Sequence, residues 1–171
     1  MKEVQLIADT NVVSYLLKRS PLGIEYEALI ASRHVGVTGC CIAELRRGAE
    51  LARWGERRLQ EQRRLLDEFS HVPDTQGMAE LCGVIHAARC RAGEPIDWPD
   101  AWAAAAALWL DVPLVTHDRD LEGIVGLRVL TAHKVWSVRE TDRGASESGP
   151  LWMGESSPSS RYLGAGDSAR Q

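Results

Sequence analysis

The sequence predicts an α/β protein with a central, mostly parallel sheet of four to five strands flanked by helices. Short apolar runs such as residues 4–8 barely alternate between polar and apolar positions, which is typical of strands buried on both faces. These runs are separated by longer segments whose apolar residues recur at helical spacing. Strands that alternate with helices favour a parallel sheet covered on both faces.

Length and composition are typical of one soluble domain. The chain has 171 residues, of which 44% are hydrophobic and 26% are charged. No apolar run is long enough to span a bilayer, and the start of the chain lacks the features of a signal peptide, so we expect a cytoplasmic protein. The four cysteines form no C-x-x-C pair, which argues against a zinc site or a disulfide framework, and we interpret them as core residues.

The charge balance is not that of a protein with a broadly basic surface for nucleic acid. The chain has 20 Lys and Arg residues against 24 Asp and Glu residues, a net charge of −4. A polyanionic substrate would therefore have to be met by local arginine clusters or by bound metal ions.

The first predicted strand, residues 4–8, leads directly into Asp9, Thr10 and Asn11. Thr10 or Asn11 can cap the helix that follows, which extends through Leu17. In open α/β sheets, ligands bind beyond the carboxyl ends of the strands, which places the Asp9 carboxylate at the mouth of such a site. The alternative is that Asp9 only caps the helix, which is the usual role of an Asp at this position.

A second helix is predicted from Pro21 to about Ser32, followed by a short strand over residues 34–38. Thr38 or Gly39 then opens a third helix, which has an apolar stripe made of Cys41, Ile42, Leu45, Ala49 and Ala52.

Glu44 lies at the edge of that stripe. A carboxylate so close to buried positions is hard to explain as part of a solvated face. The alternative, a residue at the edge that pairs with an Arg, stays open because Glu is rarely buried unpaired.

Residues 56–69 predict an amphipathic helix with mixed charges on its polar side. That side carries Arg57, Arg58, Arg63, Arg64, Glu56, Gln60 and Glu61. A solvated face is the usual interpretation of such a pattern. The alternative is a rim that contacts phosphates, for which the arginine fork is suited.

A very short strand or linker at residues 71–73 precedes a helix that is capped by Asp74 or Thr75 and ends near Gly93. We interpret Arg89 and Arg91 at its end as residues that favour the helix dipole.

The next helix begins at Asp97, the predicted N-cap, with Pro99 and Asp100 in its first turn. The face of Asp100 continues through Ala103, Ala104 and Ala107, and these small residues let the helix approach a strand closely. We therefore expect Asp100 to face the end of the sheet. Three tryptophans are interpreted as core residues or subunit contacts: Trp98, Trp102 and Trp109.

A strand over residues 114–116 is followed immediately by Asp118, and then by a helical turn that Asp118 or Asp120 caps. A last strand is predicted over residues 127–131. The composition then shifts to Ser, Gly and Pro, so we predict a domain over residues 1–135 and a flexible tail over residues 136–171.

Four carboxylates are expected to meet at one edge of the sheet, because right-handed connections gather the loops after parallel strands there. They are Asp9, Glu44, Asp100 and Asp118. Ionised together they would repel one another, and oxygen ligands of this kind suit Mg²⁺ or Mn²⁺. Such a site can deprotonate water and stabilise a phosphoryl transition state, and the Thr116 hydroxyl could hold a carboxylate or a water.

Four motifs carry a resemblance to the PIN-domain ribonucleases, and more narrowly to the VapC-type toxins of bacterial toxin–antitoxin pairs. In chain order, between Lys2 and Leu130, they are IADTN at residues 7–11, IAEL at 42–45, DAWAA at 100–104 and LVTHDRD at 114–120.

This resemblance implies a PIN-like three-layer domain that acts as a Mg²⁺-dependent endoribonuclease. It implies that Asp9, Glu44, Asp100 and Asp118 are catalytic and hold the metal. It also implies a homodimer and a cognate antitoxin that blocks the cleft.

Further residues are candidates for supporting roles around these acids. Thr10 and Thr116 match hydroxyl positions that support such sites in the family, and Asp120 is a candidate fifth acid. Asn11 follows Asp9 and Thr10 directly and is a further candidate. Asp97 could take the role of Asp100 in the site, although the alanine stripe favours Asp100. We also hypothesise RNA contacts by Arg46, Arg47 and Arg119.

Three other functions remain alternatives on the sequence alone. One is a housekeeping RNA-processing PIN nuclease, and another is a non-catalytic module that binds RNA or protein, which would be expected to have lost an acid. The third is a metal-dependent phosphatase on a similar sheet. Such enzymes often need a second Asp two residues after the first, where this chain has Asn11.

Overall fold

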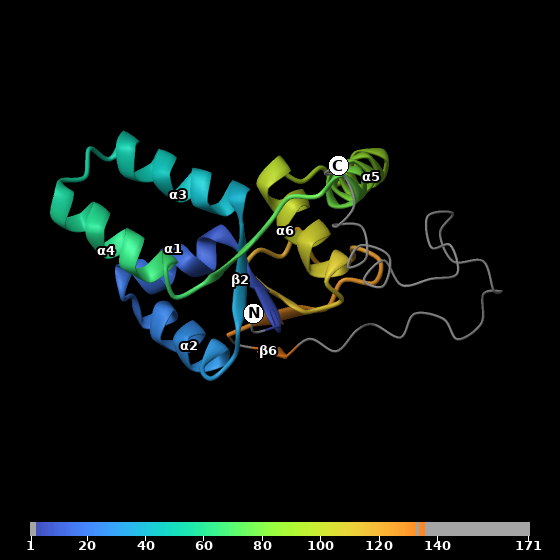
Figure 1. Ribbon diagram of the computed structural model, residues 1–171. Helices are drawn as coiled ribbons and strands as arrows, with labels where there is room; N and C mark the ends of the chain where they lie inside the picture. Colours follow the sequence, from blue (N-terminus) through green and yellow to red (C-terminus); the bar gives the residue numbers. More distant parts are fainter. Residues whose placement is uncertain (1–2, 133, 136–171) are drawn as a thin grey trace, which may run out of the picture. The chain divides into compact units, whose positions relative to one another are not determined.

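The computed structural model describes residues 3–132 and 134–135, which form a six-stranded sheet with helices on both faces (Figure 1). The strand order is β3-β2-β1-β4-β5-β6, with β1 to β5 parallel and β6 antiparallel to β5. The strands are β1 Leu6–Ala8, β2 Val35–Thr38, β3 Ser70–Val72, β4 Leu114–Val115, β5 Val129–Thr131 and β6 Lys134–Val135. The predicted α/β class is confirmed, and the added β6 is too short to leave a pattern in the sequence.

Six helices connect the described strands. They are α1 Thr10–Lys18, α2 Pro21–Ile30, α3 Gly39–Leu51, α4 Glu56–Leu66, α5 Gln76–Arg91 and α6 Trp98–Trp109. Each was expected from the sequence, but α2 and α4 end two or three residues earlier than predicted. No helix in the described part of the chain is long and apolar enough to cross a membrane.

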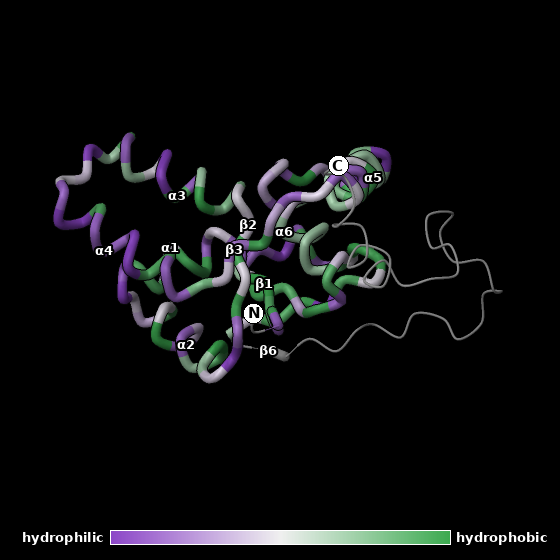
Figure 2. Tube along the Cα trace, in the orientation of Figure 1, coloured by the Kyte–Doolittle hydropathy of each residue, from purple (hydrophilic) through white to green (hydrophobic). Residues whose placement is uncertain are grey.

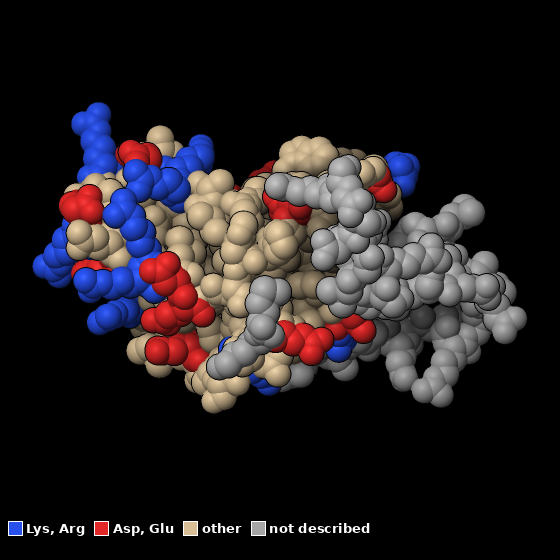
Figure 3. All heavy atoms as spheres, in the orientation of Figure 1, with Lys and Arg blue, Asp and Glu red and all other residues tan. Residues whose placement is uncertain are grey.

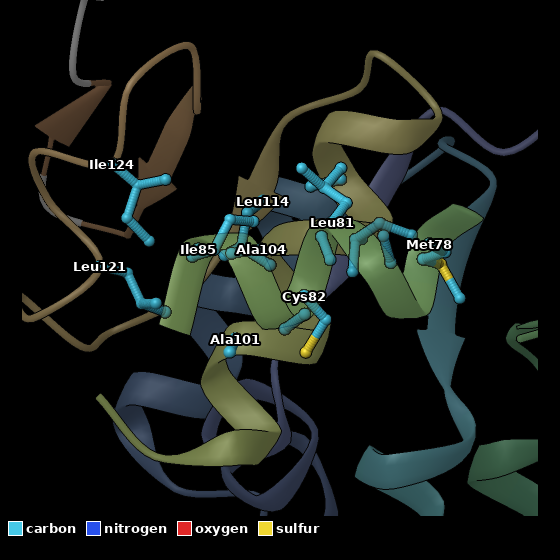
Figure 4. Packing of buried hydrophobic residues seen from close by; sticks show 14 of the residues in the cluster. Met78, Leu81, Cys82, Ile85, Ala101, Ala104, Leu114, Leu121 and Ile124 are labelled. Atoms are coloured by element: carbon cyan, nitrogen blue, oxygen red, sulfur yellow. The ribbon is translucent and has the colours of Figure 1, made fainter. Parts of the chain in front are cut away.

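The two faces of the sheet are covered by two separate hydrophobic clusters. In β1, Ile7 belongs to the cluster formed with α5 and α6, whereas Leu6 and Ala8 belong to the cluster formed with α1, α2 and α3. Figure 4 shows the first cluster, in which side chains of α5 pack against α6 and β4. Hydrophobic residues concentrate in β1 and the helices against it, while α4 is mostly hydrophilic (Figure 2). The central strand is therefore buried on both faces, as predicted.

The alanines of α6 allow this helix to lie directly on the sheet. Ala101 and Ala103–Ala107 are all buried, and α6 contacts β1, β2 and β4. Side chains this small let the backbone of a helix come close to neighbouring strands. As a result, the N-terminus of α6, which carries Asp97 and Asp100, is fixed near the carboxyl ends of the strands.

For three helices, the structure shows which of the predicted residues occupies the N-cap. Asp9, rather than Thr10 or Asn11, occupies the N-cap of α1, because the helix already begins at Thr10. Thr38 caps α3 and Thr75 caps α5, each through a side-chain hydroxyl that accepts a backbone N–H three residues later.

The prediction that all four cysteines are core residues was wrong for one of them, and the three tryptophans divide between the core and the surface. Among the cysteines, Cys41 and Cys82 are buried and Cys40 is partly exposed, but Cys90 is exposed near the end of α5. Trp102 and Trp109 pack against the first hydrophobic cluster, whereas Trp98 is exposed. The Trp98 ring instead stacks on His86 of α5, with ring centroids 4.1 Å apart.

The helices α3 and α4 form a hairpin that a buried glutamine holds together. The Gln62 side chain of α4 donates a hydrogen bond from Nε2 to the Leu45 carbonyl of α3 at 2.9 Å. In the turn, Arg53 adopts a left-handed conformation with φ of 51°, and the Trp54 N–H donates to the Ala49 carbonyl at 3.0 Å. The hairpin therefore has a defined geometry. The predicted tail, residues 136–171, lies outside the described residues.

Candidate functional site

The Asp9 carboxylate lies at the carboxyl end of the central strand and is almost completely buried. One oxygen accepts the Thr10 N–H at 2.5 Å, and the other accepts the Thr116 hydroxyl at 2.8 Å. The sequence left open whether Asp9 caps a helix or belongs to a site. In the structure the same carboxylate caps α1 and lies next to the residues that follow β4.

Glu44 lies on α3 and is held by the first helix. The Thr10 hydroxyl donates to its Oε2 at 2.6 Å. In the described residues Glu44 forms no ion pair with an Arg, so the pairing that the sequence left open is not what holds it. Thr10 and Thr116 thus each orient one carboxylate of the predicted set.

The loop after β4 brings Asp118 to the same end of the sheet. The Asp118 N–H donates to the Thr116 hydroxyl at 3.0 Å, and the Asp118 carboxylate accepts the Asp120 N–H at 2.8 Å. Thr116 therefore connects Asp9 with the backbone of Asp118 through a single hydroxyl. Asp120 is exposed and lines a separate small polar pocket with Arg89 and Glu94.

Tyr26 of α2 forms hydrogen bonds with the loop that follows β4. The sequence gave no reason to expect this contact. The fully buried Tyr26 hydroxyl donates to the Thr116 carbonyl at 3.1 Å and is hydrogen-bonded to Nδ1 of His117 at 2.9 Å. The contact joins residues 90 positions apart. It fixes the backbone from which the Thr116 hydroxyl reaches Asp9.

The start of α6 contributes two carboxylates of different character. Asp97 occupies the N-cap position, but its side chain makes no capping hydrogen bond, so that part of the prediction was wrong. Pro99 stands two residues later and has no N–H to offer, which removes one of the two donors that a cap normally meets. Asp97 is exposed, whereas Asp100 in the first turn is half-buried.

Burial and like charge act together on these acids. Burial raises the pKa of Asp9, its hydrogen bonds with Thr116 and Thr10 lower it, and the charges of Glu44 and Asp118 raise it further. For Asp100, burial and then the charges of Asp9, Asp118, Glu44 and Asp97 raise the pKa to about 7. Like charge from the other predicted carboxylates therefore raises the pKa values of both Asp9 and Asp100.

An open cleft of about 670 Å³ begins at Asp9, Glu44 and Asp100, whereas Asp118 does not line it. Its lining includes Asp9, Thr10, Asn11, Glu44, Asp97 and Asp100. Its cationic lining residues are Lys18 and Arg58. The arginines hypothesised to contact RNA do not line it: Arg46 pairs with Glu50, Arg47 is exposed, and Arg119 lines the small polar pocket. Composition alone could not distinguish Arg58 from its neighbours on α4.

The donor atoms fit a hard cation that keeps part of its water shell. Among the described residues, no three His, Cys, Asp or Glu side chains are arranged as a ready-made metal site. Mg²⁺, however, is usually held by one or two carboxylates together with water and substrate phosphates. Asp9 and Asp100 supply such carboxylates, and the buried Oδ1 of Asn11 in the same cleft has no hydrogen-bond partner. Oxygen donors with excess negative charge suit Mg²⁺ or Mn²⁺.

The raised pKa values predict how stability without metal depends on pH. Between the ordinary value of 3.8 and about 7, folded Asp100 keeps a proton that the unfolded chain has released. The free energy of unfolding should therefore fall as pH rises through this window. We expect the Tm in EDTA to decrease from pH 5 to pH 8, and Mg²⁺ to raise it at pH 8. The Tm of Asp100→Asn should decrease less steeply over the same pH range. If its Tm fell with pH as steeply as that of the parent, the raised pKa would not belong to Asp100.

Comparison with known proteins places the chain in a structural context. The family model described as PIN domain matches residues 6–127. No curated protein shows a significant match. Among solved structures, DNA-bound VapBC from Salmonella typhimurium is 25% identical with a TM-score of 0.67, covering 75% of this chain and 98% of that chain.

Two further structures are similar over a comparable length. VapBC-1 from nontypeable Haemophilus influenzae is 24% identical with a TM-score of 0.66, covering 77% of this chain and 100% of that chain. FitAcB from Neisseria gonorrhoeae is 24% identical with a TM-score of 0.65, covering 75% of this chain and 99% of that chain. At these identities the two matches concern the fold.

Proposed function

The chain belongs to the PIN-domain family, and we propose that it is a Mg²⁺-dependent endoribonuclease that serves as the toxin of a toxin–antitoxin module. One observation carries the proposal: Asp9, Glu44 and Asp100 line one cleft at the carboxyl end of the sheet, and the Thr116 hydroxyl links Asp9 to the backbone of Asp118. If these acids had only a structural role, we would expect them to form ion pairs with Lys or Arg. Here the polar partners of Asp9 and Glu44 are the hydroxyls of Thr116 and Thr10 and the Thr10 N–H.

Each acid has a defined role in this proposal. Asp9 and Asp100 would hold the ion, and Glu44 and Asp118 would add negative charge around it. When bound, Mg²⁺ supplies a lowered pKa for an attacking water and stabilises the charge that develops on the phosphoryl group. Thr116 and Thr10 keep the carboxylates of Asp9 and Glu44 in fixed orientations.

Loading of the ion should release a proton. At neutral pH, Asp100 with a pKa of about 7 is partly protonated, and a ligating carboxylate must give up that proton. Proton release on addition of Mg²⁺ would therefore accompany binding near pH 7.

The proposed partners follow from the solved relatives and from the charge of the cleft. The similar VapBC structures contain VapBC pairs, which supports a small antitoxin as partner of this chain. The acidic end of the cleft would attract an antitoxin Arg that reaches Asp9, Asp100 or Asp118, because its guanidinium forks onto carboxylates. A homodimer and a cytoplasmic location complete the proposal.

Removal of metal tests the chemistry directly. The purified full chain should cleave a mixed RNA pool in Mg²⁺, lose that activity in EDTA, and regain it when Mg²⁺ or Mn²⁺ is added in excess. The products would be followed by gel electrophoresis, with Asp9→Asn purified in parallel to exclude a contaminating nuclease. Undiminished cleavage in a metal-free preparation would contradict the carboxylate mechanism.

A further inference from the structure

We propose that Trp54 and Arg58 form a stacking subsite for an unpaired base of the RNA, at the end of the cleft away from the acids. This inference rests on the proposed ribonuclease function and adds where and how the enzyme contacts its substrate beyond the cleaved bond. The subsite favours a single-stranded segment, because a base within a duplex already stacks on its neighbours.

The walls of the cleft show its direction. On α1, the lining residues Thr10, Ser14 and Lys18 recur every four positions, and on α3 the lining residues Glu44, Gly48 and the C-cap Ala52 do the same. Residues with this spacing share one face of a helix. One wall therefore carries the hydroxyl partner Thr10 at the start of α1, and the other carries its acid, Glu44, near the middle of α3. The cleft continues from there along both helices toward their C-terminal ends.

Trp54 and Arg58 stand where these walls end. Trp54 lies in the turn after α3, and Arg58 lies in the first turn of α4. Both line the cleft, together with Lys18 at the end of α1. From Glu44 to Leu51, α3 advances by about 10 Å, which exceeds the rise of one stacked nucleotide, about 3.4 Å. A strand cleaved at the acids would thus place a neighbouring nucleotide, not the scissile one, at Trp54.

The pair presents flat surfaces of the kind that bind bases. The guanidinium carbon of Arg58 lies 4.1 Å from the centroid of the Trp54 ring. Proteins that bind single strands stack bases on aromatic rings and on arginine planes, and arginine also neutralises the backbone.

Arg58 differs in charge pairing from two other arginines of α4. Arg57 pairs with Glu61 and Arg63 pairs with Glu56, whereas Arg58 forms no ion pair among the described residues. Lys and Arg side chains gather over the α3–α4 end of the molecule (Figure 3). Arg58 is the arginine of this cationic end that both lines the cleft and stacks on a ring, which explains how an acidic chain could hold a polyanion there.

The Trp54–Arg58 pair is held in place by the α3–α4 hairpin, and the cleft beside it has space for a base. The Trp54 backbone is fixed by its hydrogen bond to Ala49, and Gln62 ties α4 to α3 through Leu45. The adjoining lining residues are Gly48, Ala49 and Ala52, and apart from the backbone of its own helix and its chain neighbours, nothing lies within 4 Å of a Cβ placed on Gly48. A purely structural pair would need no such space, whereas a base would.

The test measures binding of a fluorescein-labelled single-stranded oligoribonucleotide by anisotropy in Mg²⁺, with Asp9→Asn full-length chain to prevent cleavage. Adding Trp54→Ala should raise the Kd by about 5- to 150-fold, the range found for loss of one base–aromatic stack. Trp54→Phe should retain most of the affinity, and Arg58→Gln should weaken it. The matched control is Arg57→Gln, one residue away on α4 but absent from the cleft lining, which should bind like the parent.

An abasic scan separates stacking from support of the fold. Single abasic nucleotides placed along the oligoribonucleotide should weaken binding at one position when Trp54 is present, and that sensitivity should vanish in Trp54→Ala. If Trp54→Ala does not fold, Trp54→Phe and Trp54→Leu give the same comparison, because only Phe offers an aromatic face. A Kd unchanged by loss of Trp54, or an abasic profile independent of it, would overturn the subsite.

A cleavage assay of the unmodified chain, run beside these binding measurements, distinguishes the two proposals. If the unmodified chain cleaves RNA but its affinity does not depend on Trp54, the subsite is wrong and the ribonuclease proposal stands. If the unmodified chain neither binds nor cleaves RNA, both are overturned.

Discussion

Asp100→Asn should abolish RNA cleavage while leaving the chain folded, whereas Asp97→Asn should keep most of the activity. Asp100 is half-buried and its pKa is raised to about 7 by burial and by the charges of the surrounding acids. Its replacement removes a proposed metal ligand. We therefore expect a loss larger than about a hundredfold, the upper range for residues that merely support metal ligands.

Asp97 is a matched control because it lies three residues earlier on the same helix start. It lines the cleft but is exposed, and its side chain makes no capping hydrogen bond whose loss could destabilise α6. Asn is as good as Asp at a helix N-cap, so the fold should be unaffected.

The measurements are kcat/KM in Mg²⁺ and thermal unfolding of each variant. In EDTA near pH 8, Asp100→Asn should unfold at the same temperature as the parent or higher, because one of several repelling charges is gone. An active Asp100→Asn beside an inactive Asp97→Asn would show that the two residues have exchanged roles.

The positions of the acids could be predicted because they depend on local pattern. The buried run of β1 stops at Asp9, and that of β4 stops just before Asp118, so parallel packing alone brings both residues to one edge of the sheet. Likewise, the alanine face of α6 correctly indicated that Asp100 lies near the sheet. A strand end and a helix face are visible in sequence without knowledge of distant neighbours.

The residues that hold the acids could not be predicted, because their burial depends on partners far along the chain. Tyr26 looks like any aromatic residue of an amphipathic helix until its hydroxyl is seen on the Thr116 carbonyl. Gln62 was indistinguishable from the solvated residues of α4, yet it is buried and donates to Leu45. Arg57 and Arg58 are adjacent and chemically identical, and only the direction of each side chain assigns Arg58 to the cleft.

Expression of the chain alone in a bacterial host should arrest growth, and Asp9→Asn should relieve the arrest without lowering the amount of folded protein. Asn at this position can still accept the Thr10 N–H and cap α1, and its amide can donate to the Thr116 hydroxyl, so the substitution removes charge rather than structure. Growth curves after induction, with immunoblots for protein level, give the measurement.

Co-expression of the small gene neighbouring this one should relieve the arrest as well, because an antitoxin would fill the acidic cleft and exclude the ion from Asp9 and Asp100. Purification of a stable complex of the two chains, inactive on RNA until the partner is removed, would connect the relief to direct binding. Fold resemblance alone does not fix a biological role, and a nuclease that processes RNA in the growing cell would need no inhibitor. Normal growth of cells that contain the folded chain, shown to be active on RNA after purification, would therefore contradict the toxin proposal and favour the housekeeping nuclease.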